Sequence, residues 1–108
     1  MYFYDPQDRP GKELVAGVII RSFWGDKMLA SLVDLEPNAV IPGHSHPHEQ
    51  IGVVVAGEYT ITIGEETRLV GPGDIYIIPG GVSHGVVTGE AQSTAFEVFS
   101  PVREEYKY

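Results

Sequence analysis

The sequence contains no cysteine, and its 7 lysine and arginine residues are outnumbered by 15 aspartate and glutamate residues. The absence of cysteine excludes disulfide bonds, thiolate ligands for zinc and a cysteine nucleophile. The formal net charge of −8 argues against nucleic acid or an anionic membrane surface as a partner, because both carry negative charge themselves. An anionic small molecule would therefore need a local cation in its binding site.

Long apolar runs are also missing. No segment approaches the roughly 20 apolar residues that a membrane-spanning helix requires. The first residues, MYFYDPQDRP, do not combine a basic region with an apolar run, so we expect no signal peptide and a cytoplasmic location. The chain shows no linker or internal repeat, and its length is that of one domain, so we predict a single domain over residues 1–108.

Short apolar or alternating segments, separated by glycine and proline turns, make up most of the chain. No segment of ten residues or more has helical periodicity, although a short turn at Arg103–Tyr108 fits the sequence. Eight or nine short strands of this kind predict an all-β sandwich or closed barrel. The expected strands include Leu14–Ile20, Met28–Leu35, Gln50–Ala56, Tyr59–Ile63, Thr67–Val70, Ile75–Ile78, Gly85–Thr88 and Ser93–Ser100.

All four histidines fall within two stretches, Pro42–Gln50 and Gly73–His84. Side chains alternate along a strand, so His44 and His46 would project to the same side about 7 Å apart and bind one divalent ion together. Two further ligands become available if the fold brings the two stretches together. The predicted metal ligands are His44, His46, Gln50 and His84.

The neighbours of these residues have alternative roles. Gln50 is predicted to bind through its amide oxygen, but it could instead orient a ligand histidine. Glu49 precedes Gln50 on the same strand, so it should face the other way. His48 follows Pro47, which can redirect the chain, and we interpret His48 as flanking the site; contact with the metal is the alternative.

The two stretches resemble the two motifs of the cupin superfamily, G-x5-H-x-H-x(3,4)-E-x6-G and G-x5-P-x-G-x2-H-x3-N. The resemblance implies a single-domain jelly-roll barrel, also called a double-stranded β-helix, that holds one metal ion inside. The first motif spans residues 38–57 and the second spans residues 73–88. Three positions depart from the pattern: Asn38 stands in place of the first glycine, Thr88 in place of asparagine, and Gln50 in place of the glutamate ligand. The first change is mild, because asparagine tolerates a left-handed backbone better than most residues.

The glutamine changes the expected chemistry. Three neutral imidazoles and a neutral amide leave the charge of a divalent ion uncompensated, which favours an anionic ligand. The set also differs from the two-histidine, one-carboxylate site of non-haem iron oxygenases, which weakens a dioxygenase interpretation. Zinc, nickel, manganese and iron all accept such ligands.

A narrower resemblance involves HPHEQ in the first motif and FEVFSPVRE near the end of the chain. Both are similar to the small cupins of pectin and alginate breakdown, which convert unsaturated monouronates to linear keto sugars. The resemblance implies that Glu97, in place of the usual aspartate, is the catalytic carboxylate. It also implies that Arg103 binds the substrate carboxylate and assists catalysis, and that Phe99 packs on the sugar. Alternation alone leaves open whether the Glu97 and Phe99 face or the Phe96 and Val98 face points into the barrel.

These observations favour a metal-dependent enzyme that opens the ring of a small anionic sugar. Two alternatives remain, namely another metal-dependent cupin enzyme such as a dioxygenase, and a cupin that binds sugars or other small molecules without catalysis. Apolar residues lie on both faces of segments such as Val18–Ile20 and Val53–Val55, more than one small barrel interior can use. We therefore predict a homodimer.

Overall fold

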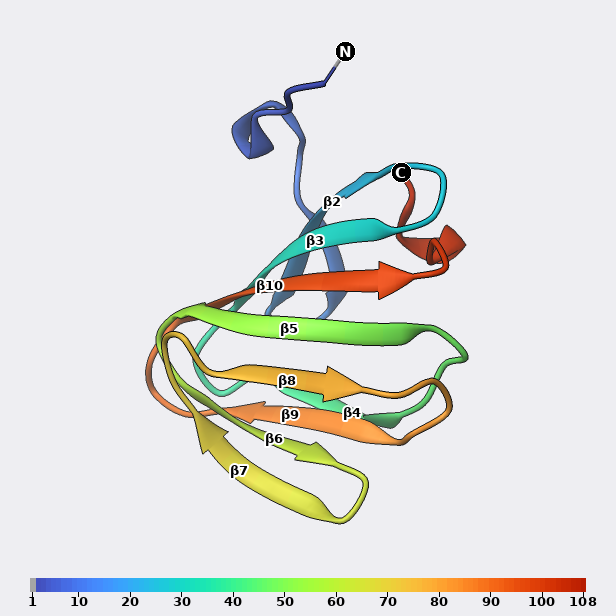
Figure 1. Cartoon of the computed structure of the whole chain (residues 1–108). Helices are drawn as coiled ribbons and strands as arrows, with labels where there is room; N and C mark the ends of the chain where they lie inside the picture. The colour runs from blue at the N-terminus through green and yellow to red at the C-terminus, as the bar shows by residue number, and fades with distance from the viewer. Residues whose placement is uncertain (1) are drawn as a thin grey trace.

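The computed structural model describes residues 2–108, which form two antiparallel β-sheets and two short 3-10 helices (Figure 1). The all-β prediction is confirmed. No helix in this range has the length and apolar character needed to cross a membrane. The elements are η1 (Pro6–Asp8), β1 (Lys12–Val15), β2 (Val18–Trp24), β3 (Leu29–Leu35), β4 (Val40–His44), β5 (Glu49–Ala56), β6 (Tyr59–Ile63), β7 (Glu66–Val70), β8 (Ile75–Ile78), β9 (His84–Thr88), β10 (Ser93–Ser100) and η2 (Glu104–Tyr106).

The strands pair as in a jelly roll. One sheet has the order β1-β2-β3-β10-β5-β8 and the other has the order β4-β9-β6-β7. In Figure 1, β2, β3, β10 and β5 lie side by side in the upper part, and β9, β6 and β7 lie below them. Alternate side chains from both sheets meet in one apolar core, which includes Val18, Ile20, Leu35, Val54 and Ile61. The sheets thus enclose a single interior.

The predicted strand Leu14–Ile20 is wrong as one continuous element. The chain reverses at Ala16 and Gly17, and Val15 pairs with Val18 across the turn. Gly17 has a φ of +79°, a left-handed conformation that glycine adopts without a steric penalty. The apolar run therefore contains a hairpin, with β1 on one side and β2 on the other.

The departures from the first and second motifs have local explanations. Asn38 adopts a φ of +57°, as expected for an asparagine in the place of a glycine. Thr88 is buried, and its hydroxyl accepts a hydrogen bond from the backbone N–H of Ala39 at 2.7 Å and donates to the carbonyl of Glu36 at 2.8 Å. Thr88 therefore links β9 by hydrogen bonds to the connection between β3 and β4. The strand β4 was not among the strands expected from the sequence.

The outer face of the six-stranded sheet is apolar over four strands. Two cross-strand rows run from β8 through β5 and β10 to β3, and both consist of apolar residues. On β8, Ile75 is 69% exposed and Ile77 is 58% exposed, so residues 2–108 do not cover this face. The rows are Ile75, Val53, Phe96 and Leu32, and Ile77, Ile51, Val98 and Ala30.

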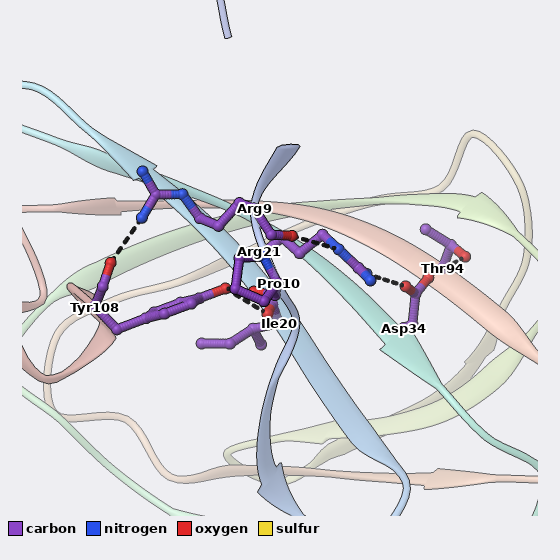
Figure 2. Close-up of polar contacts among 7 residues, drawn as sticks. All are labelled: Arg9, Pro10, Ile20, Arg21, Asp34, Thr94 and Tyr108. Carbon is purple, nitrogen blue, oxygen red and sulfur yellow. Dashed lines mark hydrogen bonds and ion pairs between the residues drawn. The ribbon is translucent and has the colours of Figure 1, made fainter. Parts of the chain in front are cut away.

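The segment after β10 is fastened to the segment before β1 (Figure 2). The hydroxyl of Tyr108 lies 2.8 Å from the carbonyl oxygen of Pro10 and 2.9 Å from that of Ile20. The guanidinium of Arg9 donates to the carbonyl of Tyr108 at 2.7 Å and lies over the rings of Phe23 and Trp24, 5.0 Å from each centroid. We call these contacts the terminal clamp.

Next to the clamp, Arg21 forms a surface ion pair with Asp34. Its Nη1 lies 3.2 Å from Oδ2 of Asp34, and its Nε donates to the carbonyl of Arg9 (Figure 2). Thr94 donates to the other carboxylate oxygen of Asp34 at 3.0 Å. This network links β2, β3 and β10 on the outside of the barrel.

Candidate metal centre and cavity

Three histidines converge inside the barrel. His44 ends β4 and pairs with His84 at the start of β9, while His46 lies in the turn after β4. Their ring centroids are 4.4 Å apart for His44 and His84, 4.9 Å for His46 and His84, and 5.9 Å for His44 and His46. One ligand atom from each ring lies within 4.8 Å of the other two. The expectation that His44 and His46 share one strand is wrong, since the turn brings His46 to the pair.

The tautomers of two rings suit metal binding. Nδ1 of His44 lies 2.9 Å from the carbonyl oxygen of Pro42, and Nδ1 of His84 lies 2.9 Å from that of Val82. Each Nδ1 therefore carries the proton that it donates, and each Nε2 keeps its lone pair. Nε2 of His84 is buried and has no hydrogen-bond partner among the described residues. A buried acceptor without a partner fits a metal ligand.

His46 is held in the same uncharged form. Burial lowers the pKa of His46 to about 4, with a further contribution from the positive charge of Arg103. Burial also lowers the pKa of His84. Neutral imidazole is the form that binds metal, so both rings are ready for a ligand role at neutral pH.

Gln50 completes the set of donor atoms. Its amide nitrogen donates to Oε2 of Glu97 at 2.5 Å, which fixes the amide orientation and turns Oε1 the other way. Oε1 lies 3.1 Å from Nε2 of His46. Two ligand atoms bound at right angles to one ion are about 3 Å apart. The donor set of three imidazoles and one amide oxygen therefore fits the implied metal.

The two flanking residues remain outside this group. His48 is not part of the histidine cluster formed by the described residues, although its ring centroid is 5.5 Å from that of His46. Glu49 is exposed, as expected for a residue on the opposite face from Gln50. Neither residue lines the cavity described below.

Glu97 points into the barrel. It accepts one hydrogen bond from the amide of Gln50 and another from the hydroxyl of Tyr76 at 3.0 Å. Both bonds end on Oε2, and Oε1 receives none from residues 2–108. Burial raises the pKa of Glu97, while the donors on Gln50 and Tyr76 act in the opposite direction. The carboxyl group is thus a stronger base than a solvated glutamate.

The face shared by Glu97 and Phe99 is the inner one, which resolves the ambiguity left by strand alternation. Phe99 is 1% exposed and does not line the cavity. Its ring packs against His46 at a centroid distance of 5.7 Å and against Tyr106 at 5.4 Å. Phe99 therefore packs in the core against His46 and Tyr106, and its ring has no exposed face that a sugar could contact.

Arg103 belongs to the segment after β10 and lines the cavity. Its guanidinium lies over the ring of Tyr106 at 4.1 Å and over that of Phe99 at 5.2 Å. Its Nε is 2.7 Å from a carboxylate oxygen of Glu105, whose side chain is 58% exposed. An exposed partner binds weakly, because water screens the pair. A carboxylate in the cavity can therefore compete with Glu105 for this arginine.

One cavity of about 410 Å³ connects these groups. Much of its wall is aliphatic and includes Val18, Leu35 and Ile61. Sequence reasoning missed three tyrosines in its wall, and the signal for one of them was alternation, because Tyr76 shares the inner face of β8 with Ile78. The polar and aromatic residues that line the cavity are His44, Gln50, Tyr59, Tyr76, His84, Glu97, Arg103 and Tyr106.

A two-sheet barrel with histidines converging in its interior is the arrangement that the sequence motifs implied. The family model of the cupin domain matches residues 31–99, which include all three converging histidines. The chain belongs to the cupin family.

The chain is also similar to individual proteins of known sequence or structure. The chain is 33% identical over 107 residues to the pectin degradation protein KdgF of Dickeya dadantii (strain 3937), covering 97% of this chain and 96% of that protein. The solved structure of KdgF from Halomonas sp. has a TM-score of 0.91 and 28% identity, with 99% of each chain covered. The polyketide cyclase RemF from Streptomyces resistomycificus has a TM-score of 0.80 and 27% identity, covering 94% of this chain and 79% of RemF.

Proposed function

We propose that this protein is a metal-dependent enzyme of pectin or alginate breakdown, which opens the ring of 4,5-unsaturated monouronates to give linear keto sugars. The observation that carries the proposal is the cavity itself. It combines two histidines of the cluster, an inward-facing carboxylate and an arginine in a chain that aligns over almost its full length with a pectin degradation protein. A uronate matches this chemistry, since it carries both a carboxylate and several hydroxyl groups.

The cofactor in this proposal is one divalent ion, with zinc, nickel, manganese and iron as candidates. Three histidine rings and the amide oxygen of Gln50 would hold it, because these donor atoms already converge. When bound, the ion supplies positive charge that polarises sugar oxygens. The histidine ligands are His44, His46 and His84.

Arg103 binds the uronate carboxylate. A guanidinium presents two parallel N–H groups to a carboxylate, which fixes the sugar in one orientation as well as holding it. The ring of Tyr106 supports the guanidinium from one side at 4.1 Å. The substrate is thereby placed between Arg103 and the carboxyl group of Glu97, both of which line the same cavity.

Glu97 moves the proton. It takes the proton of the anomeric hydroxyl, the bond between the anomeric carbon and the ring oxygen breaks, and an aldehyde and an enolate form. Glu97 then returns the proton to carbon 4, and the enolate becomes a ketone. The reaction is an isomerisation, so it needs no oxidant, reductant or second substrate. The free Oε1 and the raised pKa of Glu97 suit it for both steps.

The test mixes metal-loaded protein with unsaturated galacturonate or mannuronate and follows the loss of the conjugated double-bond absorbance. We expect the loss to be faster than the spontaneous reaction, with or without dioxygen. No acceleration, with binding of the sugar still measurable by calorimetry, would indicate a non-catalytic sugar-binding cupin. Acceleration that requires dioxygen would indicate a dioxygenase.

Replacement of Arg103 by alanine should mainly weaken substrate binding. The loss of a charge-assisted pair costs about 1.5–3 kcal/mol, so we expect KM to rise by about 10- to 100-fold while kcat changes much less. Steady-state kinetics on the unsaturated uronate measure both constants. Arg68→Ala is the matched control, because Arg68 is exposed on β7 and does not line the cavity. An unchanged KM in Arg103→Ala would show that the carboxylate binds elsewhere.

We also propose that a second copy of this chain covers the outer face of the six-stranded sheet. The centre of this face is apolar over four strands, while charged residues such as Glu49, Asp34 and Arg21 lie toward its margins. An apolar centre with a polar rim is the pattern of protein interfaces, and a two-fold dimer places the same patch on both subunits. Large continuous apolar patches are rare on monomers, which favours an interface on this face.

The dimer is tested with an Ile75→Glu/Ile77→Glu variant, which places two charges at the most exposed part of the face. We expect wild type to have twice the monomer mass of 11.8 kDa in light scattering at micromolar concentration, and the variant to have the monomer mass. Leu69→Glu is the control, because Leu69 is 60% exposed on the other sheet. A monomeric wild type would contradict the proposal.

A further inference from the structure

A polar row crosses the inner face of the six-stranded sheet at the level of Glu97. Gly52 on β5 pairs with Tyr76 on β8 on one side and with Glu97 on β10 on the other. The row continues to Ser31 on β3 and Ser22 on β2, whose buried hydroxyl groups are 3.1 Å apart. Tyr76 and Glu97 are thus two strands apart, and the residue between them has no side chain.

The glycine leaves the space that the tyrosine ring occupies. A Cβ atom at residue 52 would lie 2.5 Å from Cε1 and Cζ of Tyr76 and 2.7 Å from its hydroxyl oxygen. Such distances are too short for any side chain, so the ring of Tyr76 lies directly over Gly52. This placement lets the Tyr76 hydroxyl reach across β5 and donate to Oε2 of Glu97 at 3.0 Å.

A second tyrosine, Tyr59, forms a hydrogen bond with Tyr76. The hydroxyl oxygens of Tyr59 and Tyr76 are 2.7 Å apart, and their rings meet edge to face. Because Tyr76 donates its own proton to Glu97, it accepts from Tyr59. Burial raises the pKa of both hydroxyl groups, which keeps both of them as donors. The hydrogen bonds therefore run in one direction, from Tyr59 through Tyr76 to Glu97.

We propose that Tyr76 is a positioning residue for the catalytic carboxylate. Together with the amide of Gln50, it binds Oε2 of Glu97 and so directs Oε1 toward the substrate; Tyr59 and Gly52 fix the place of Tyr76. Two donors on one oxygen restrain rotation of the carboxyl group more than one donor does. This inference rests on the proposed role of Glu97 in ring opening.

Tyr76→Phe tests the inference, because it removes the donor and keeps the ring. We expect kcat on the unsaturated uronate to fall by about 10- to 100-fold, with KM within about twofold of wild type and an unchanged metal content. Tyr59→Phe leaves the bond from Tyr76 to Glu97 in place and removes only the hydrogen bond that supports Tyr76, so its loss of kcat should be smaller than that of Tyr76→Phe. A kcat of Tyr76→Phe equal to that of wild type would overturn the inference.

Two further variants separate positioning from folding. In Tyr76→Phe the hydroxyl of Tyr59 loses its partner, whereas Tyr59→Phe/Tyr76→Phe leaves no unpaired hydroxyl; we expect the same loss of kcat in both. Tyr76→Phe/Glu97→Gln should be no slower than Glu97→Gln alone, since Tyr76 acts through Glu97. Fully additive losses, or recovery of kcat in the double phenylalanine variant, would contradict the proposal.

A crystal structure of Tyr76→Phe supplies a measurement that does not depend on turnover. We expect the Glu97 carboxyl group to occupy a second rotamer there, while wild type has one. An unchanged single rotamer would overturn the positioning role even if the variant is slow. If wild type does not convert unsaturated uronates at all, the proposed function fails, and the rotamer comparison still decides whether Tyr76 orders Glu97.

Discussion

Glu97→Gln is expected to reduce turnover of the unsaturated uronate by about 10²- to 10⁴-fold, because the amide can neither accept the anomeric proton nor return it to carbon 4. The fold and the metal content should not change, since the side chain keeps its shape and an oxygen that can accept from Tyr76. The measurement is the loss of double-bond absorbance under saturating substrate, with elemental analysis of the same sample.

The control for this variant is Glu49→Gln. Glu49 lies on β5 beside a proposed ligand, but it is exposed and points away from the cavity, so its loss of charge should leave kcat unchanged. Wild-type turnover in Glu97→Gln would leave ring opening standing and would assign the proton transfer to another group.

His84→Ala is expected to remove the metal and with it all measurable activity. His84 contributes a buried Nε2 without another partner, and the loss of one ligand from a four-donor site lowers metal affinity by about 100-fold or more. Elemental analysis after dialysis should give close to one ion per chain for wild type and less than about a tenth of that for the variant. In a structure of the loaded protein, the imidazole nitrogens should lie about 2.0–2.2 Å from the ion.

His48→Ala serves as the matched control for the metal. It removes a histidine whose ring centroid lies 5.5 Å from that of His46, yet His48 stands outside the ligand cluster, so the variant should keep its full metal content. Full metal content in His84→Ala would contradict the site. Loss of metal in His48→Ala would make His48 a ligand.

The sequence predicted the histidine cluster because its signal is local. The spacing within residues 44–50 and 73–84 is readable without a structure, and the structure brings His84 to His44 through the pairing of β4 with β9. The prediction of one strand over Leu14–Ile20 was wrong for a reason that is also local. An apolar run does not show by composition that a glycine within it reverses the chain, as Gly17 does.

Contacts that arise between strands could not be predicted in the same way. The role of Gly52 depends on its pairing with Tyr76 and Glu97, two residues that are far from it in the sequence. The burial of Phe99 beneath His46 and Tyr106 likewise depends on where the segment after β10 returns. Strand alternation restricted Glu97 and Phe99 to one face, and only the sheet order decided that this face is the inner one.

The terminal clamp has a consequence for the order in which the molecule folds. It joins Arg9 and Pro10 to Tyr108, residues that are 99 and 98 positions apart, whereas the pairing of β4 with β9 joins His44 to His84 over a shorter stretch of the chain. The clamp closes a longer loop than the β4–β9 pairing does, and loop closure costs more entropy as the loop lengthens. We therefore expect the part of the cavity wall that contains Arg103 and Tyr106 to form after the histidine cluster.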